Sequence, residues 1–256
     1  MISPEPAKGE RVAKAMARAG LCSRREAERW IAEGRVSVDG AVLTSPAVLV
    51  TEASDLRVDG KPVPTREPAR LWRYHKPAGL VTTHRDEKSR PTVFDRLPPE
   101  LPRVISVGRL DLTSEGLLLL TNDGELARSL ELPARGWLRR YRVRVHGTVD
   151  PARLAALEKG LTLDGISYGP IRASLERQQG SNAWIAVGLH EGKNREIRKV
   201  MAHLGLDVTR LIRVAYGPFQ LGHLARGAVE EVPRRVLREQ LGADVAKGKP
   251  GADRRR

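Results

Sequence analysis

An acidic side chain beside an apolar strand is the first candidate for chemistry in this sequence. The segment from Gly108 to Gly124 reads GRLDLTSEGLLLLTNDG, so Asp111 follows Arg109 by two positions and precedes a run of four leucines. An ionised carboxylate that loses its water costs several kcal/mol unless a cation pairs with it. We therefore expect Asp111 to have a counter-ion, and two interpretations stay open: a structural ion pair or a catalytic carboxylate.

A helix expected to begin near Asn194 is one source of that cation. Its apolar positions form a buried stripe and leave Arg195, Arg198 and Lys199 along the margins. Arginine suits the role better than lysine, because its planar fork is always charged and binds both carboxylate oxygens. Spacing alone does not distinguish a partner for Asp111 from an arginine that simply lies along an amphipathic helix.

The balance of charge predicts a polyanionic partner. The chain has 256 residues, with 45 Lys and Arg against 31 Asp and Glu and a formal net charge of +14. Such an excess favours nucleic acid or an anionic membrane surface. Membrane insertion is disfavoured, because no run of about eighteen apolar residues occurs and the start, MISPEPAKGE, has no apolar signal region. We expect a cytoplasmic protein.

Metal and cofactor chemistry have no support in the sequence. Cys22 is the one cysteine, and the six histidines are scattered without metal-ligand spacing. Neither common glycine-rich nucleotide loop is present. We expect no metal and no cofactor.

The first quarter of the chain predicts a small unit of two helices and two hairpins. Helical spacing covers residues 11–19, and Ser23 with Glu26 forms a capping box that begins a second helix. The Asp-Gly dipeptides at 39–40 and 59–60 are typical of tight hairpins. The sequence PTREP that follows has two prolines and no hydrophobic periodicity, which indicates a linker.

The rest of the chain predicts a second domain dominated by strands. Asp150 and Asn194 are expected helix starts. Strands are expected at 71–75, 79–83, around 117–120, 139–146 and 183–189. The expected organisation is a flexible tail at 1–8, a small domain at 9–67, a larger domain at 68–240 and a disordered basic tail at 241–256.

Four segments of the larger domain together resemble the pseudouridine synthases, in the branch that modifies ribosomal RNA. They read YHKPAGLVTT, GRLDLTSEGLLLLTNDG, RRYRVRV and EGKNREIRKVMAHLGLDVTRLIRVAYG. The resemblance implies an α+β fold with a mixed, largely antiparallel sheet and flanking helices. It also implies cofactor-free isomerisation of uridine, in which the bond from ribose to uracil N1 breaks and a bond to C5 forms.

The resemblance assigns roles to individual residues. Asp111 is the essential carboxylate, which either attacks the anomeric carbon or removes a neighbouring ribose proton, and Arg198 is its partner. Tyr141 packs on the flipped uracil, and Leu211 closes its other face, although each residue is more often ordinary core. Arg109 enters the space vacated by the base or holds its phosphate.

The small domain resembles the alpha-L (S4-type) RNA-binding motif in the segments ARAGLCSRREAERWI and GRVSVDG. An ordinary solvated helix face is the alternative interpretation of its charges. The residues that this resemblance turns toward RNA phosphates are Lys14, Arg18, Ser23, Arg24, Arg25 and Arg35.

A second basic run precedes and enters the strand at 139–146. It consists of Arg135, Arg139, Arg140, Arg142 and Arg144. We expect it to follow an RNA backbone beside the cleft, against the alternative of solvated charge on an edge strand.

The fourth segment favours the large-subunit branch of the family. Asn194, Arg195 and Glu196 stand where another subgroup has tyrosine, histidine and glutamine, and Arg195 is assigned to RNA binding. The expected partner is ribosomal RNA or a pre-ribosomal particle, bound by a monomer. The alternatives are the same enzyme acting on small-subunit RNA and a non-catalytic ribosome-assembly factor, for which a carboxylate facing a polyanion would serve no purpose.

Overall fold

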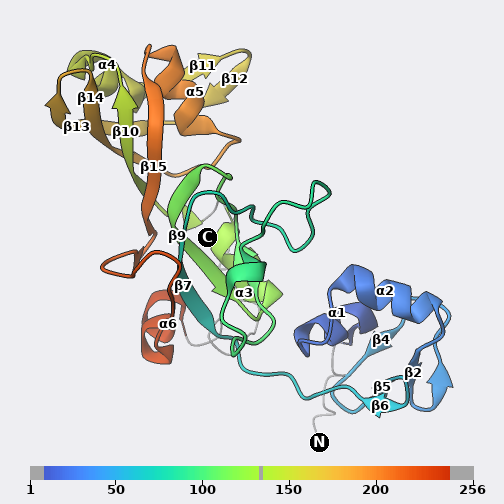
Figure 1. Cartoon of the computed structure of the whole chain (residues 1–256). Helices are drawn as coiled ribbons and strands as arrows, with labels where there is room; N and C mark the ends of the chain where they lie inside the picture. The colour runs from blue at the N-terminus through green and yellow to red at the C-terminus, as the bar shows by residue number, and fades with distance from the viewer. Residues whose placement is uncertain (1–8, 133–134, 243–256) are drawn as a thin grey trace, which may run out of the picture.

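The chain forms two packed units joined by an extended segment (Figure 1). The structure is a computed structural model that describes residues 9–132 and 135–242. Residues 63–70 between the units belong to no helix or strand, at the place where the PTREP sequence predicts a linker. The expected tail at 1–8 and residues 243–256 of the expected C-terminal tail lie outside the described residues.

The first unit packs two helices on short strands. Its helices are α1 (Val12–Arg18) and α2 (Arg24–Ala32), and their buried residues share one core with Val36 and Val50. A four-stranded sheet has the order β3-β2-β5-β6, and β1 pairs with β4. The strands are β1 (Glu10–Arg11), β2 (Val36–Val38), β3 (Ala41–Val42), β4 (Leu49–Val50), β5 (Leu56–Val58) and β6 (Lys61–Pro62).

The local signals in this unit are confirmed. Ser23 Oγ accepts the amide of Glu26 at 3.2 Å, and the Glu26 carboxylate accepts the amide of Ser23 at 2.7 Å, which is the reciprocal capping box. Asp39 and Gly40 have φ of 51° and 85°, and the dipeptide at 59–60 has 52° and 75°. Two consecutive positive φ angles make the tight hairpin turn that these residue types favour.

The second unit is built on a nine-stranded sheet with the order β13-β14-β10-β15-β9-β7-β17, with β16 beside β15 and β8 beside β9. The pairing of β15 with β9 is parallel, and the other neighbours pair antiparallel, as the fold class predicts. The strands are β7 (Leu71–Lys76), β8 (Ile105–Val107), β9 (Ser114–Thr121), β10 (Arg139–His146), β13 (Ile171–Gln179), β14 (Asn182–Leu189), β15 (Asp207–Tyr216), β16 (Phe219–Gln220) and β17 (Val229–Glu231), with a separate hairpin of β11 (Leu161–Leu163) and β12 (Ile166–Tyr168).

The run of four leucines is explained by a strand that is buried on both faces. Leu118 and Leu120 of β9 face one hydrophobic core, and Leu117 and Leu119 face the other. Helices α4 (Pro151–Ala156) and α5 (Glu196–His203) contribute to the first core, and α3 (Gly124–Glu131) and α6 (Arg234–Leu241) to the second. Each fully buried leucine contributes roughly 1.5–3 kcal/mol, so β9 anchors the domain.

Several element predictions need correction. The strand expected at 79–83 is a single bridge between Val81 and Thr92, because Pro77 and Gly79 turn the chain after β7. Helix α5 begins after Arg195 rather than Asn194. Helix α6 was not predicted, and its last residue is buried inside what was expected to be the disordered tail. The short 3-10 helices are η1 (Phe94–Arg96) and η3 (Leu157–Lys159). Across the described ranges, none of the helices has the length and apolar composition needed to span a bilayer.

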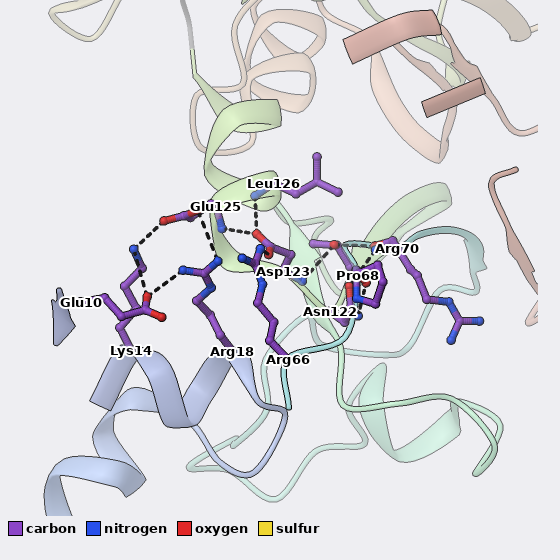
Figure 2. A network of polar contacts seen from close by, with 11 residues as sticks. Glu10, Lys14, Arg18, Arg66, Pro68, Arg70, Asn122, Asp123, Glu125 and Leu126 are labelled. Atoms are coloured by element: carbon purple, nitrogen blue, oxygen red, sulfur yellow. Dashed lines mark hydrogen bonds and ion pairs between the residues drawn. The ribbon is translucent and has the colours of Figure 1, made fainter. Parts of the chain in front are cut away.

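Ion pairs connect the two units at the start of α3 (Figure 2). Lys14 Nζ lies 2.5 Å from Glu125 Oε1, and an Arg18 guanidinium nitrogen lies 3.9 Å from the other oxygen. In the connecting segment, Arg66 pairs at 2.5 Å with Asp123, the N-cap of α3. Carboxylates in the first turn of a helix interact favourably with the helix dipole. Asp123 and Glu125 therefore stabilise the start of α3 even without their basic partners.

We expect Glu125→Ala to loosen this docking without unfolding either core. Partly exposed ion pairs contribute about 1 kcal/mol or less, so trypsin should cleave the segment at 63–70 several-fold faster while the melting temperature changes by less than about 2 °C. Glu158→Ala, at an exposed residue of η3 that makes no ion pair in the described part of the chain, is the matched control. A cleavage rate equal to that of the parent would contradict the docking role of Glu125.

Candidate active site

The loop that carries Asp111 is held by a buried lysine. Lys76 ends β7 with no solvent exposure, and its Nζ donates to the carbonyls of Pro77 at 3.0 Å, Asp111 at 3.1 Å and Ser114 at 2.8 Å. Burial lowers the pKa of Lys76 to about 8, and the negative charge of Asp111 opposes that shift. One ammonium group therefore ties both ends of the turn at 111–114 to the end of β7.

Every backbone carbonyl of residues 110–114 accepts a hydrogen bond. The amide of Ser114 donates to the Asp111 carbonyl at 3.0 Å, which closes the turn. The other donors are Thr82 Oγ1 to Leu110 at 2.9 Å, the Gly79 amide to Leu112 at 2.7 Å and Arg198 Nη2 to Thr113 at 3.2 Å. Because every carbonyl of this loop has a partner, the direction of the Asp111 side chain is fixed by backbone contacts.

Asp111 opens into a cavity of about 320 Å³. Its side chain is 37% exposed, so the expectation of a carboxylate deprived of water is wrong, and the cavity rather than the apolar strand surrounds it. The cavity is lined by acidic, basic, aromatic and apolar side chains, among them Arg109, Asp111, Arg139, Tyr141, Lys193, Arg195, Glu196, Leu211 and Arg213.

The cation that pairs with Asp111 is Arg195, with 3.9 Å between Nη1 and Oδ2. The expected partner, Arg198, makes no such pair: its guanidinium donates to the carbonyls of Thr113 and Val208, each at 3.2 Å. Burial lowers the pKa of Arg198, while the charge of Asp111 raises it, so the two groups interact through space. Arg198 braces the loop, and Arg195 takes the role of counter-ion.

Arg195 reaches Asp111 through an unusual backbone conformation. It precedes α5 with φ of 51° and ψ of 30°, in the left-handed region. A non-glycine residue in that region costs of order 1–3 kcal/mol when its surroundings force it there. The same conformation ends the loop at 190–195 and directs the chain into α5, which places the guanidinium at the cavity.

Tyr141 and Leu211 come to the cavity from adjacent strands. Tyr141 lies on β10 opposite Arg213 of β15, and both Tyr141 and Leu211 are buried. The parallel pairing of β15 with β9 sets Leu211 beside Ser114. The structure thus brings Arg109, Asp111, Tyr141, Arg195 and Leu211 together around one cavity, as the sequence predicts for their positions.

Arg213 is a cavity residue that the sequence patterns do not single out. Arg213 is buried, its Nε donates to the Leu117 carbonyl at 2.7 Å, and its Nη2 has no hydrogen-bond partner among the described residues. The backbones meet closely here, because a Cβ at Gly116 would lie 2.3 Å from the Arg213 carbonyl oxygen. The available signal was strand alternation, which puts Arg213 on the same face of its strand as Leu211.

Glu196 is a second acidic group at the cavity. One of its oxygens accepts the Lys193 amide at 2.9 Å, and the other is buried without a partner among the described residues. Burial raises the pKa of Glu196 to about 7, and the charge of Glu191 adds to the effect. Glu191 itself accepts the Gly169 amide at 2.7 Å and pairs with Lys193. Glu196 therefore keeps its proton well above the ordinary carboxyl range.

The expected RNA-facing residues of the small domain divide into three groups: paired, capping, and exposed without an acidic partner. Lys14 and Arg18 pair with Glu10 as well as Glu125 (Figure 2). Arg35 pairs with Asp59 at 2.6 Å. The Ser23 hydroxyl caps α2, while Arg24 and Arg25 are exposed and have no carboxylate within 4.0 Å in the described part of the chain.

The basic run at 135–144 does not lie along the cleft as expected. Arg139 lines the cavity and donates to the hydroxyl of Tyr216 at 3.1 Å, and Arg135 stacks on Trp137. The side chains of Arg140, Arg142 and Arg144 leave the sheet on the face opposite Tyr141, because successive residues of a strand alternate in direction.

Comparison with known proteins decides the family. A family model described as RNA pseudouridylate synthase matches residues 70–203, and one described as S4 domain matches residues 10–56. The chain belongs to the RNA pseudouridine synthases. It is accordingly an isomerase with an RNA-binding domain in front of the catalytic domain, as its sequence predicts.

Relatives match over nearly the whole chain. An "Uncharacterized RNA pseudouridine synthase" of Rickettsia felis is 49% identical over 228 residues, 89% of this chain and 99% of the relative. A "Ribosomal large subunit pseudouridine synthase B" of Yersinia pestis is 42% identical over 247 residues, 93% of this chain and 78% of the relative. A solved structure titled "Crystal structure of pseudouridylate synthase" is 25% identical, with a TM-score of 0.62, and the match covers 89% of this chain and 97% of that one.

The shifted pKa of Glu196 predicts a pH dependence of stability. Between about pH 4.5 and about pH 7 the unfolded chain releases this proton while the folded chain keeps it, so this group's contribution to stability falls as the pH rises. Glu196→Gln keeps the shape of the protonated group and has no proton to release. We expect its melting temperature to exceed that of the parent by at least about 2 °C at pH 7, with a smaller gap near pH 5.

Thermal melts of both proteins across this range measure the difference. Glu158→Gln, at an exposed carboxylate of η3, is the matched control. Melting curves whose separation does not change with pH would contradict a protonated Glu196.

Proposed function

We propose that this enzyme converts a specific uridine of ribosomal RNA, in the large subunit, to pseudouridine by a mechanism that depends on Asp111. The observation that carries the proposal is the carboxylate of Asp111, on a loop held by backbone hydrogen bonds, in a cavity lined with arginine and tyrosine. The relatives named as large-subunit pseudouridine synthases support the choice of RNA.

The cavity requires the uridine to leave its stack. A base within a paired or stacked RNA cannot reach a carboxylate recessed in a cavity, so the nucleotide must be extruded. Tyr141 offers a ring for one face of the uracil, worth about 1–3 kcal/mol by stacking, and Leu211 an apolar surface for the other. Arg109 lies at the cavity wall next to the loop, where it can hold a phosphate or fill the vacated stack.

Asp111 performs the chemistry at the sugar. Its ionised oxygen either attacks the anomeric carbon or removes a neighbouring ribose proton. In both routes the bond from ribose to N1 breaks, the bond to C5 forms, the proton on C5 is lost and N1 gains one. Arg195 pairs directly with this carboxylate, and the charge of Asp111 raises the pKa of the nearby Arg198.

The small domain supplies affinity for the surrounding RNA. Arg24 and Arg25 are exposed and ready for phosphate contacts. Lys14 and Arg18 must exchange the carboxylate of Glu125 for a phosphate when RNA binds there. We propose that the protein acts in the cytoplasm as a monomer, on ribosomal RNA or a pre-ribosomal particle.

The non-catalytic alternative is disfavoured by the same cavity. A protein that only binds RNA gains nothing from a carboxylate held among its cations, because it repels phosphate. The family match names an enzyme. Action on small-subunit RNA differs from the proposal only in the substrate, and mapping pseudouridines in both ribosomal RNAs of cells lacking the gene separates the two.

We expect Asp111→Asn to abolish the reaction while leaving RNA binding within about threefold. The amide keeps the shape of the side chain but is neither a nucleophile nor a base. Release of tritium from ribosomal RNA labelled at uracil C5 measures turnover, and filter binding measures affinity. Glu131→Gln, at another carboxylate of the cavity wall, is the control, and tritium release by Asp111→Asn at the parental rate would refute the assignment.

A further inference from the structure

The face of the sheet opposite the cavity carries a row of arginines. In β10, the exposed residues Arg140, Arg142 and Arg144 alternate with Tyr141 and other buried residues. Residues two apart on a strand are about 7 Å apart and point the same way. The alternation that sends Tyr141 into the cavity therefore builds a cationic row on the other side.

Neighbouring strands extend this row into a surface. Arg144 lies opposite Trp184 of β14 and opposite Arg210 of β15. On β13, Arg172 lies beside Gly188 and Arg177 beside Trp184. We call this surface the arginine face; it consists of Arg140, Arg142, Arg144, Arg172, Arg177, Trp184 and Arg210.

No helix of the described chain packs on this part of the sheet. Helices α4 and α5 belong to the core on the cavity side, with Val143 and Ile185. Helices α3 and α6 pack on the opposite side, but over β7 and β9 at the other end of the sheet. Figure 1 shows α3 and α6 near β7 and β9, far along the sheet from β13 and β14. The arginine face is therefore open to solvent.

Intramolecular carboxylates neutralise only part of its charge. Arg142 pairs with Glu176 at 2.9 Å, and Arg210 pairs with Glu115. Arg140 and Arg177 donate to the amide oxygens of Gln220 and Gln179. Within residues 9–132 and 135–242, Arg140, Arg144, Arg172 and Arg177 have no carboxylate within 4.0 Å.

An aromatic ring lies in the middle of this charge. The Arg142 guanidinium sits 4.8 Å from the centre of the Trp184 ring. Basic side chains on an open surface together with an aromatic ring are the composition that binds RNA strands through phosphates and stacking. RNA is the established substrate class of this protein, and it is the polyanion that complements these charges.

We propose that the arginine face is a second RNA-binding surface, which holds the backbone of a segment of ribosomal RNA outside the element that enters the cavity. This inference rests on the proposed ribosomal substrate. It adds a site on the opposite side of the sheet, so that the RNA contacts the catalytic domain at two separate places. Binding there raises affinity for long RNA and leaves the chemical step unchanged.

The test uses the triple variant Arg144→Ala, Arg172→Ala, Arg177→Ala in the full chain. The first probe is an unmodified large-subunit ribosomal RNA transcript, and the second is a fragment of about 20 nucleotides around the uridine that the parent modifies. We expect the Kd for the transcript to rise about tenfold near physiological salt. The slope of log Kd against log salt concentration should fall by about 2, because three phosphate contacts are lost. The turnover of saturating fragment should stay within about twofold.

A matched control removes the same charge from the exposed arginines of α6, as Arg234→Ala, Arg235→Ala, Arg238→Ala. The control should retain the parental salt slope. An unchanged Kd and slope for the arginine-face variant, or an equal loss in the control, would overturn the proposal. Because binding to the transcript is measured without turnover, a failure of the proposed reaction would be seen separately, as absence of pseudouridine with intact binding.

Discussion

One buried ammonium group holds the loop that carries Asp111 in place. Lys76 has no solvent exposure, and its charge is satisfied by three backbone carbonyls. Carbonyl dipoles can stabilise a buried cation only if they remain oriented, because an unpaired buried charge is far more costly than a broken neutral hydrogen bond. The lysine and the loop thus fix each other, and the direction of the Asp111 side chain follows from this mutual constraint.

The order of strands explains how the other cavity residues meet that loop. The parallel pairing of β15 with β9 brings Leu211 beside Ser114, and β10 adds Tyr141 from the next position in the sheet. Gly116 permits the two strands to approach, because any side chain there would strike the backbone of Arg213. The same pleat that turns Tyr141 toward the cavity turns the arginines of β10 away from it, so one strand serves two surfaces.

Local patterns in the sequence are sufficient to predict most of the helices, turns and strands. The capping box at Ser23, the Asp-Gly turns and the leucine strand each depend on contacts within a few residues, and each is confirmed. The choice between Arg195 and Arg198 was wrong, because it depends on a left-handed residue that helical spacing does not reveal.

Contacts between distant residues were beyond sequence reasoning. Lys14 and Arg18 were assigned to RNA, but the partner that they meet, Glu125, lies more than a hundred residues away. The role of Lys76 was missed because a lysine at the end of a strand resembles an exposed residue until the loop that covers it is known. The direction of the β10 arginines, by contrast, follows from strand alternation once Tyr141 is assigned to the cavity.

The most direct test of the central constraint is the turnover number of Lys76→Met, a substitution of similar volume without charge or donors. Measured with ribosomal RNA labelled at uracil C5, kcat should fall by at least about 100-fold, because a small displacement of a catalytic group has an effect of that size. Its Kd for RNA should stay within about threefold, and circular dichroism should show a folded protein. A folded Lys76→Met enzyme that retains the parental kcat would contradict the account.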